Sequence, residues 1–94
     1  MSRFLAVDRA VTDELLLTSH RALPADPLRR VALVAEEAGE AVKAALDLTR
    51  PTLPAHDIAY KRKELRKELV QTVAMGLRVL EAMAEEDATE PNED

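Results

Sequence analysis

Residues Val34-Ala35-Glu36-Glu37-Ala38-Gly39-Glu40-Ala41-Val42-Lys43 place three carboxylates in an otherwise apolar run. At about 100° per residue this run is helical, because its apolar residues and those on either side of it fall on one face. That face comprises Leu28, Val31, Ala32, Ala35, Ala38, Gly39, Val42, Ala45 and Leu46. The stretch therefore predicts an amphipathic helix that carries a group of acids outside its apolar face.

The position of two of these acids indicates that they face another helix. Glu37 and Glu40 are three residues apart, so their side chains are neighbours on the helix surface. An acidic face that is merely solvated would be expected to have polar flanks. The flanks here are apolar, namely Leu33, Ala41 and Ala44. We therefore expect the two carboxylates to lie in a seam between helices.

The composition predicts a single all-α domain. The chain has 94 residues, of which 47% are hydrophobic and 33% charged, a balance typical of a globular protein. Enrichment in Ala, Leu, Glu, Lys and Arg favours helices over sheet. The chain contains no cysteine, which excludes disulfides and thiolate metal sites and fits the reducing cytoplasm in which we expect the protein.

The charge pattern argues against a nucleic acid or a membrane as the main partner. The net charge is −5, whereas domains that bind a nucleic-acid backbone normally carry a basic excess. One basic cluster comprises Lys61, Arg62, Lys63, Arg66 and Lys67. Because Glu64 and Glu68 interrupt this cluster, we favour a solvated helix face over a nucleic-acid patch. The longest charge-free apolar run, Leu69 to Leu77, is too short to span a bilayer and no signal peptide is visible, so we expect a soluble protein.

Capping residues mark the first two helices. Ser2 can cap a helix whose apolar residues recur at helical spacing until Thr18-Ser19-His20 ends it. Asp26 can cap a second helix, with Pro27 at the first helical position, where its missing N–H costs nothing. This helix should run to about Leu48, because the next eight residues include two prolines.

A third helix is predicted from Ile58 to about Glu86, with Asp57 as its cap. At 1.5 Å per residue it would be roughly 43 Å long, more than a compact domain of this size needs. We therefore expect a four-helix-bundle-like core in which two long antiparallel helices are completed by oligomerisation, as a dimer or a tetramer. Residues 1–86 would form the domain, and the acidic residues 87–94 read as a disordered tail.

Antiparallel packing of the two long helices would complete an acidic site. Glu64, Glu68 and Gln71 share a stripe on the third helix and would face Glu37 and Glu40. Carboxylates brought together in a partly buried seam repel one another, and a hard divalent cation is one remedy. Oxygen ligands of this kind suit Mg²⁺ or Mn²⁺. The competing interpretation is a solvated acidic face paired with lysines and arginines.

The order of these residues resembles a known family. Glu36-Glu37-Ala38-Gly39-Glu40 is similar to the EExxE element of the MazG-like, all-α nucleoside triphosphate pyrophosphohydrolases, and Glu68-Leu69-Val70-Gln71 stands where that family has ExxD. The resemblance covers about residues 28–83. It implies that Glu37, Glu40 and Glu68 bind metal and that Glu36 is a nearby acid that orients water or binds a further ion. The implied reaction is hydrolysis of a nucleoside triphosphate to the monophosphate and pyrophosphate.

The sequence departs from the family at Gln71, where the pattern has aspartate. A glutamine lends a carbonyl oxygen as fourth ligand but carries no charge. The site would then bind metal weakly, recruit Glu64, or belong to a MazG-like assembly or nucleotide-binding module that has lost turnover. Lys43, Lys61 and Lys67 are candidates for binding substrate phosphates, with ordinary surface cations as the alternative. A small mutase of the chorismate mutase type fits the length, but it needs arginines where this seam is acidic.

Overall fold

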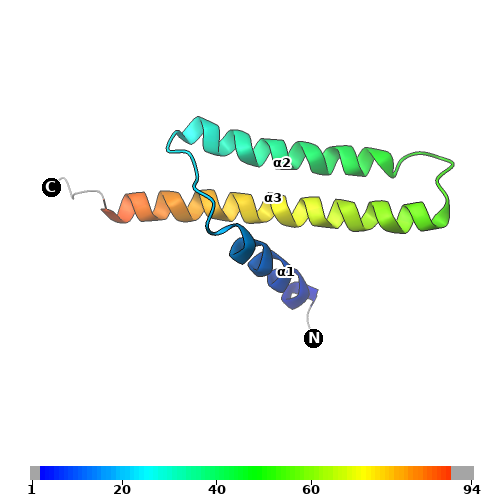
Figure 1. The fold of residues 1–94 in the computed structure, drawn as a ribbon, viewed down its shortest axis with the longest axis horizontal. Helices are drawn as coiled ribbons and strands as arrows, with labels where there is room; N and C mark the ends of the chain where they lie inside the picture. Colours follow the sequence, from blue (N-terminus) through cyan, green and yellow to red (C-terminus); the bar gives the residue numbers. More distant parts are fainter. Residues whose placement is uncertain (1–2, 90–94) are drawn as a thin grey trace.

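The computed structural model describes residues 3–89, which form three helices and no strand (Figure 1). Helix α1 spans Arg3–Thr18, α2 spans Pro27–Asp47 and α3 spans Ala55–Thr89. The all-α prediction is confirmed. The predicted capping residue Ser2 and residues 90–94 of the expected tail lie outside the described part of the chain.

Helix α2 begins where its capping residues predict. The backbone N–H of Leu28 donates to Asp26 Oδ1 at 3.0 Å, and Pro27 occupies the first helical position. These two residues determine where α2 starts. The side chain of Asp26 accepts a hydrogen bond from a backbone N–H that has no partner within the helix, and Pro27 has no N–H that would need one. The helix ends at Asp47, one residue before the predicted Leu48.

The predicted start of α3 is wrong by three residues. The carbonyl of Pro54 accepts from the N–H groups of Asp57 and Ile58, both at 3.0 Å, and the helix begins at Ala55. Asp57 is therefore not the cap but lies within the first turn, where a carboxylate is still favourable beside the positive end of the helix dipole. At the other end α3 continues to Thr89, so residues 87–89 of the expected tail are helical.

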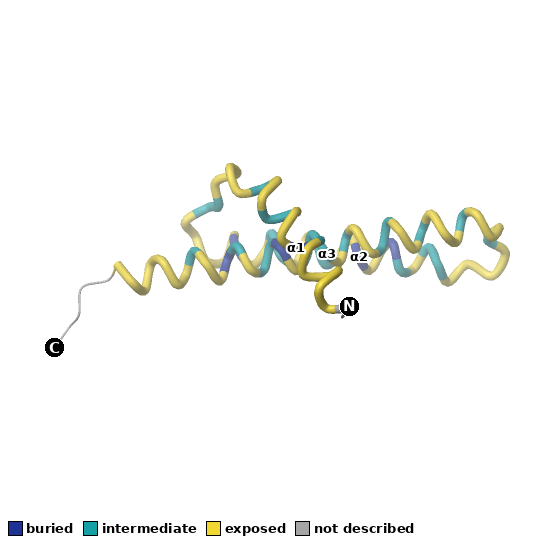
Figure 2. The backbone as a smooth tube through the Cα atoms, turned by 90° about the horizontal axis from the view of Figure 1, so that it is seen from below, coloured by how far each residue is buried: buried dark blue, intermediate teal, exposed yellow. Residues whose placement is uncertain are grey.

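The two long helices lie antiparallel and side by side, and α1 crosses α3 at a steep angle (Figure 1). Figure 2 shows that buried positions are few and lie where the helices meet. The buried apolar residues are Val11, Ala41, Ala44, Ala74 and Val79. Three of the five are alanines, whose small side chains let helix backbones approach closely. The seam between α2 and α3 is thus narrow enough for side chains on its border to reach across it.

Arg30 fixes the start of α2 to the far end of α3. Its Nε donates to the carbonyl of Pro24 at 2.6 Å, and its two terminal nitrogens donate to the Glu86 carboxylate at 2.8 and 3.0 Å. Arg30 is the one buried charged residue among those described, and these hydrogen bonds compensate for the burial of its guanidinium. The contact holds the two long helices in register at the end opposite their connecting loop.

Large apolar side chains remain exposed on all three helices. On α2 the predicted apolar face does not pack on α3, and Leu28 is 76% exposed and Leu46 61% exposed. On α3 the predicted face is also largely uncovered, with Val73 50% and Leu80 61% exposed. The total accessible surface is 7666 Å², whereas a compact monomer of this mass exposes about 5,400 Å².

None of the described helices has the length and apolar character needed to cross a membrane.

Candidate metal centre

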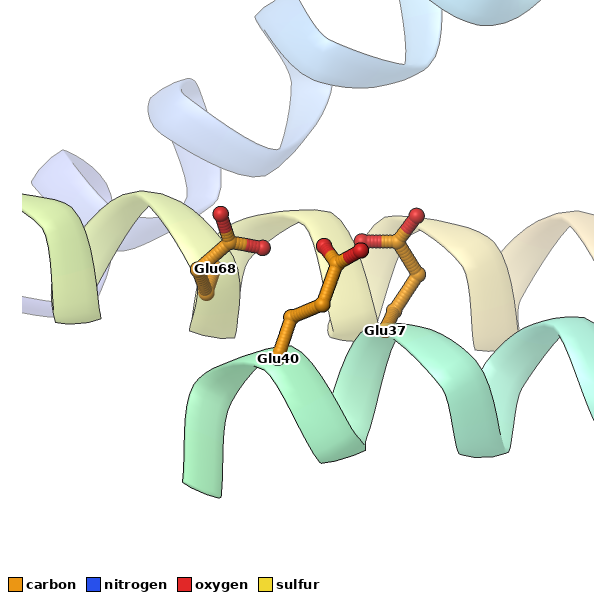
Figure 3. A group of neighbouring side chains, drawn as sticks. All are labelled: Glu37, Glu40 and Glu68. Atoms are coloured by element: carbon orange, nitrogen blue, oxygen red, sulfur yellow. The ribbon is translucent and has the colours of Figure 1, made fainter. Parts of the chain in front are cut away.

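Three carboxylates meet at the border of the seam between α2 and α3 (Figure 3). Glu37 and Glu40 extend from α2 and Glu68 from α3, and one oxygen of each lies within 4.8 Å of the others. The antiparallel packing thus brings together three of the four predicted metal ligands. The small buried residues Ala41 and Ala44, which follow on α2, allow the two helices to come this close.

Two oxygens of this group are buried without a partner. Glu37 Oε2 and Glu68 Oε2 are shielded from solvent, and no described residue donates a hydrogen bond to either atom. Removing a carboxylate oxygen from water without a compensating donor or cation is costly. No described residue donates a hydrogen bond to these two oxygens, although the positive charges of Arg21 and Lys67 lie near enough to act on Glu37 and Glu68.

The pKa values of two of the carboxyls reflect this arrangement. Burial is the largest cause that raises the pKa of Glu37, and the negative charges of Glu40, Glu36 and Glu14 raise it further. The pKa of Glu68 is also raised, first by burial and then by the neighbouring carboxylate of Glu40. In each case the charged form is disfavoured, which a bound cation would reverse.

The spacing of the three carboxylates can be compared with what a divalent cation requires. Mg²⁺ holds oxygens at about 2.0 to 2.1 Å in an octahedron, so opposite ligand oxygens lie about 4.2 Å apart and adjacent ones about 2.9 Å apart. The three carboxylate oxygens lie within 4.8 Å of one another. The glutamate side chains would have to rotate to bring their oxygens onto one cation. Glu40 is exposed, which leaves the group open to solvent and to a substrate on that side.

The other predicted acids and the amide occupy different positions. Gln71 lines the same small hollow as Glu37, and its role as a fourth ligand stays a prediction. Glu36 is exposed and lies outside the three-carboxylate group, although its charge raises the pKa of Glu37. Glu64 contacts Lys61, whose Nζ lies 3.5 Å from Glu64 Oε2.

The three lysines suggested as phosphate ligands are not equivalent. Lys61 Nζ donates to Asp47 Oδ2 at 3.3 Å, and this hydrogen bond is the largest cause that raises its pKa. Its ammonium therefore already has acidic partners. Lys67 is exposed beside Glu68 and lowers the pKa of that carboxyl. Lys43 is exposed on α2 and makes no hydrogen bond or ion pair with residues 3–89.

Two arginines that the sequence did not single out lie close to the carboxylates. Arg21, in the connector before α2, and Arg78, on α3, line the same hollow as Glu37 and Gln71. Arg78 follows Gln71 by two helical turns, so helical spacing could have identified it. Arg21 comes from a segment without periodicity, and only the folded chain places it there.

Comparison with protein-family models, with curated proteins and with solved structures finds no match to this chain.

Proposed function

We propose that the protein is a MazG-like nucleoside triphosphate pyrophosphohydrolase that uses Mg²⁺ or Mn²⁺ and acts on the nucleotide pool of the cytoplasm. The observation that carries the proposal is the pair of buried oxygens without a hydrogen-bond partner among the described residues, Glu37 Oε2 on α2 and Glu68 Oε2 on α3, whose carboxylates lie on either side of that of Glu40 (Figure 3). The order of EExxE and ExxQ elements along the chain supports the same family.

The residues divide between cation binding and proton transfer. Glu37, Glu40 and Glu68 would hold the cation, with the amide oxygen of Gln71 as a neutral ligand. When bound, Mg²⁺ offsets the negative charge of the phosphate oxygens. Glu36, exposed next to this group, is assigned to orient the attacking water and accept its proton. The water oxygen bonds to the α-phosphorus, the bond from that phosphorus to the α,β-bridging oxygen breaks, and pyrophosphate leaves.

Two measurements on the same protein test this function. Titration calorimetry with MgCl₂ and MnCl₂ should show binding to the wild type, strong weakening in Glu68→Gln and no change in Glu85→Gln. Glu85 is exposed and lies 17 residues farther along α3, about 25 Å away at 1.5 Å per residue. Hydrolysis in ¹⁸O-labelled water should place the label in the nucleoside monophosphate. Absence of metal binding, or label in orthophosphate only, would contradict the proposal.

Gln71 favours a second candidate, a MazG-like module that binds nucleotides or assembles without turnover. A neutral amide supplies one charge fewer than the aspartate of the family pattern. Such a module would bind a nucleoside triphosphate and metal but release no pyrophosphate. The two candidates therefore differ in product formation and not in binding.

We also propose that the working form is an oligomer of this chain. Against a compact monomer, the protein exposes roughly 2,200 Å² of additional surface. Obligate homodimers bury about 2,000 to 5,000 Å² in total, or about 1,000 to 2,500 Å² per subunit. The excess accessible surface thus matches the area that one subunit buries in the interface of an obligate dimer. The exposed apolar side chains on every helix are suited to form such an interface.

A further inference from the structure

The hollow lined by Glu37 of α2 is completed by three other segments of the chain. Glu14 and Thr18 reach it from the last turns of α1, Arg21 from the connector, and Gln71 and Arg78 from α3. Its volume is about 80 Å³, several times the roughly 10 to 15 Å³ that one ordered water requires. The hollow therefore has room for a group larger than a single water, directly next to the candidate metal ligands.

The two arginines of this hollow differ in what they already bind. Arg78 donates one guanidinium N–H to the backbone carbonyl of Arg21, which orients the side chain, and its other donors have no acceptor among residues 3–89. The guanidinium of Arg21 donates no hydrogen bond to any residue from 3 to 89, and its charge lowers the pKa of Glu37. One arginine is thus held in place while the other is free to close on a ligand.

The charge of the hollow depends on the metal. Glu14 and Glu37 balance the two arginines when no cation is present. A divalent cation on Glu37, Glu40 and Glu68 would cancel two of their three negative charges and make the surroundings of the two arginines less negative. Guanidinium groups are suited to phosphate oxygens because their N–H donors match two oxygens at once.

We propose that Arg21 and Arg78 bind a phosphoryl group of the leaving pyrophosphate, with the connector bringing Arg21 over it. This inference rests on the proposed function, since it needs the cation site and the triphosphate. Negative charge gathers on the pyrophosphate as the bond from the α-phosphorus to the bridging oxygen breaks. Donors fixed at that position stabilise this charge. The arginines would therefore act on hydrolysis as well as on substrate binding.

The alternative is that the arginines only tie α1 and the connector to α3. Substitution of Arg21 separates the two roles, because the structural contact uses its backbone carbonyl and not its side chain. Arg21→Ala keeps that carbonyl and should fold like the wild type, as shown by circular dichroism. Arg62→Ala removes the same charge from an exposed position on α3, 16 residues before Arg78, and is the matched control.

The test is calorimetric titration of Mg²⁺ alone and then of inorganic tripolyphosphate in saturating Mg²⁺. Arg21→Ala should bind Mg²⁺ as the wild type does but bind tripolyphosphate about 10- to 100-fold more weakly, as expected for one charge-assisted contact. Arg21→Lys should recover part of this loss, and Arg62→Ala should bind both ligands normally. Normal tripolyphosphate binding by Arg21→Ala in a protein that binds Mg²⁺ overturns the arginine site alone. A wild type that binds no Mg²⁺ overturns the proposed function and, with it, this inference.

Discussion

At the residue scale, the Glu68 carboxyl should destabilise the metal-free protein. Its pKa is raised, first by burial and then by Glu40. Because the folded protein holds this proton to a higher pH than the unfolded chain, the free energy of unfolding falls as pH rises from the ordinary value of 4.5 to the raised value. Above that range the charged form opposes folding, and a bound cation would remove this penalty.

We therefore expect Glu68→Gln to stabilise the metal-free protein at neutral pH. The same variant should bind Mg²⁺ more than about tenfold more weakly, because mutating even a residue that only hydrogen-bonds to a metal ligand lowers metal affinity by about that factor. Urea unfolding in the presence of a chelator measures the first effect, and the difference from wild type should disappear below pH 4.5. Glu85→Gln is the control for lost charge. Unfolding of Glu68→Gln would mean that this carboxylate supports the fold and is not a metal ligand.

Gln71 decides how much charge the site offers a cation. Gln71→Asp adds a charged oxygen three residues after Glu68 on the same face of α3, beside Glu37. Mg²⁺ should then bind about tenfold more tightly, or about 1.4 kcal/mol, and release of pyrophosphate from nucleoside triphosphates should increase. Calorimetry and ³¹P NMR of the products measure both. A variant that is slower than an active wild type would show that the site works with a neutral ligand.

At the element scale, the Arg30–Glu86 contact should make the packing of α2 on α3 dependent on pH. The hydrogen bond from Arg30 is the largest cause that lowers the pKa of Glu86, although partial burial opposes it. A lowered pKa means that the stabilisation is complete above the unfolded value of 4.5 and is lost as pH falls through the folded value. The contact lies at one end of the pair and so opposes separation of the helices there.

Glu86→Gln should therefore lower the thermal unfolding temperature at neutral pH, and its difference from wild type should close in acid below the folded pKa. Glu85→Gln removes the same charge one residue earlier, from an exposed side chain that makes no ion pair with residues 3–89, and should change little. Differential scanning calorimetry over a pH series measures both variants. A constant difference at every pH would contradict an ionic contribution from this pair.

The sequence-based predictions are accurate where a feature depends on residues that are close in the sequence, and less accurate where it depends on the whole fold. Asp26 and Pro27 set the start of α2 by contacts within one turn, so their pattern suffices. The start of α3 was predicted wrongly because Pro54 provides the capping carbonyl through its backbone, which leaves no side-chain signature. Acids flanked by apolar residues located the seam, whereas Arg21 reaches it from a connector whose path depends on the whole fold.

At the scale of the whole molecule, the shape is extended for its size. The radius of gyration is 16.8 Å and the longest dimension is 63 Å, whereas a compact chain of this length has a radius of gyration of about 12 Å. Helix α3 alone, with 35 residues, is about 52 Å long at 1.5 Å per residue. Two helices packed along one side cannot cover each other's remaining faces.

A groove between α1 and α3 offers one surface for a second copy. It is lined by Phe4, Leu5, Val7, Asp8, Val11, Val73 and Leu77. One acid among seven residues makes it mainly apolar, and burying such side chains contributes about 25 cal/mol per Å². Val73 lines this groove and is half exposed, so a charge there would have to be desolvated on association.

We expect the wild type to have at least twice the 10.4 kDa mass of the chain and a thermal unfolding temperature that rises with protein concentration. Val73→Asp should shift the mass to that of the monomer or, where the monomer does not fold alone, lower the unfolding temperature at every concentration. Thr52→Asp introduces the same charge at an exposed position in the loop between α2 and α3 and should leave both properties unchanged. Light scattering measures the mass and circular dichroism the unfolding. A wild type that is monomeric and folded at micromolar concentration, with an unfolding temperature independent of concentration, would show that the exposed apolar faces do not associate.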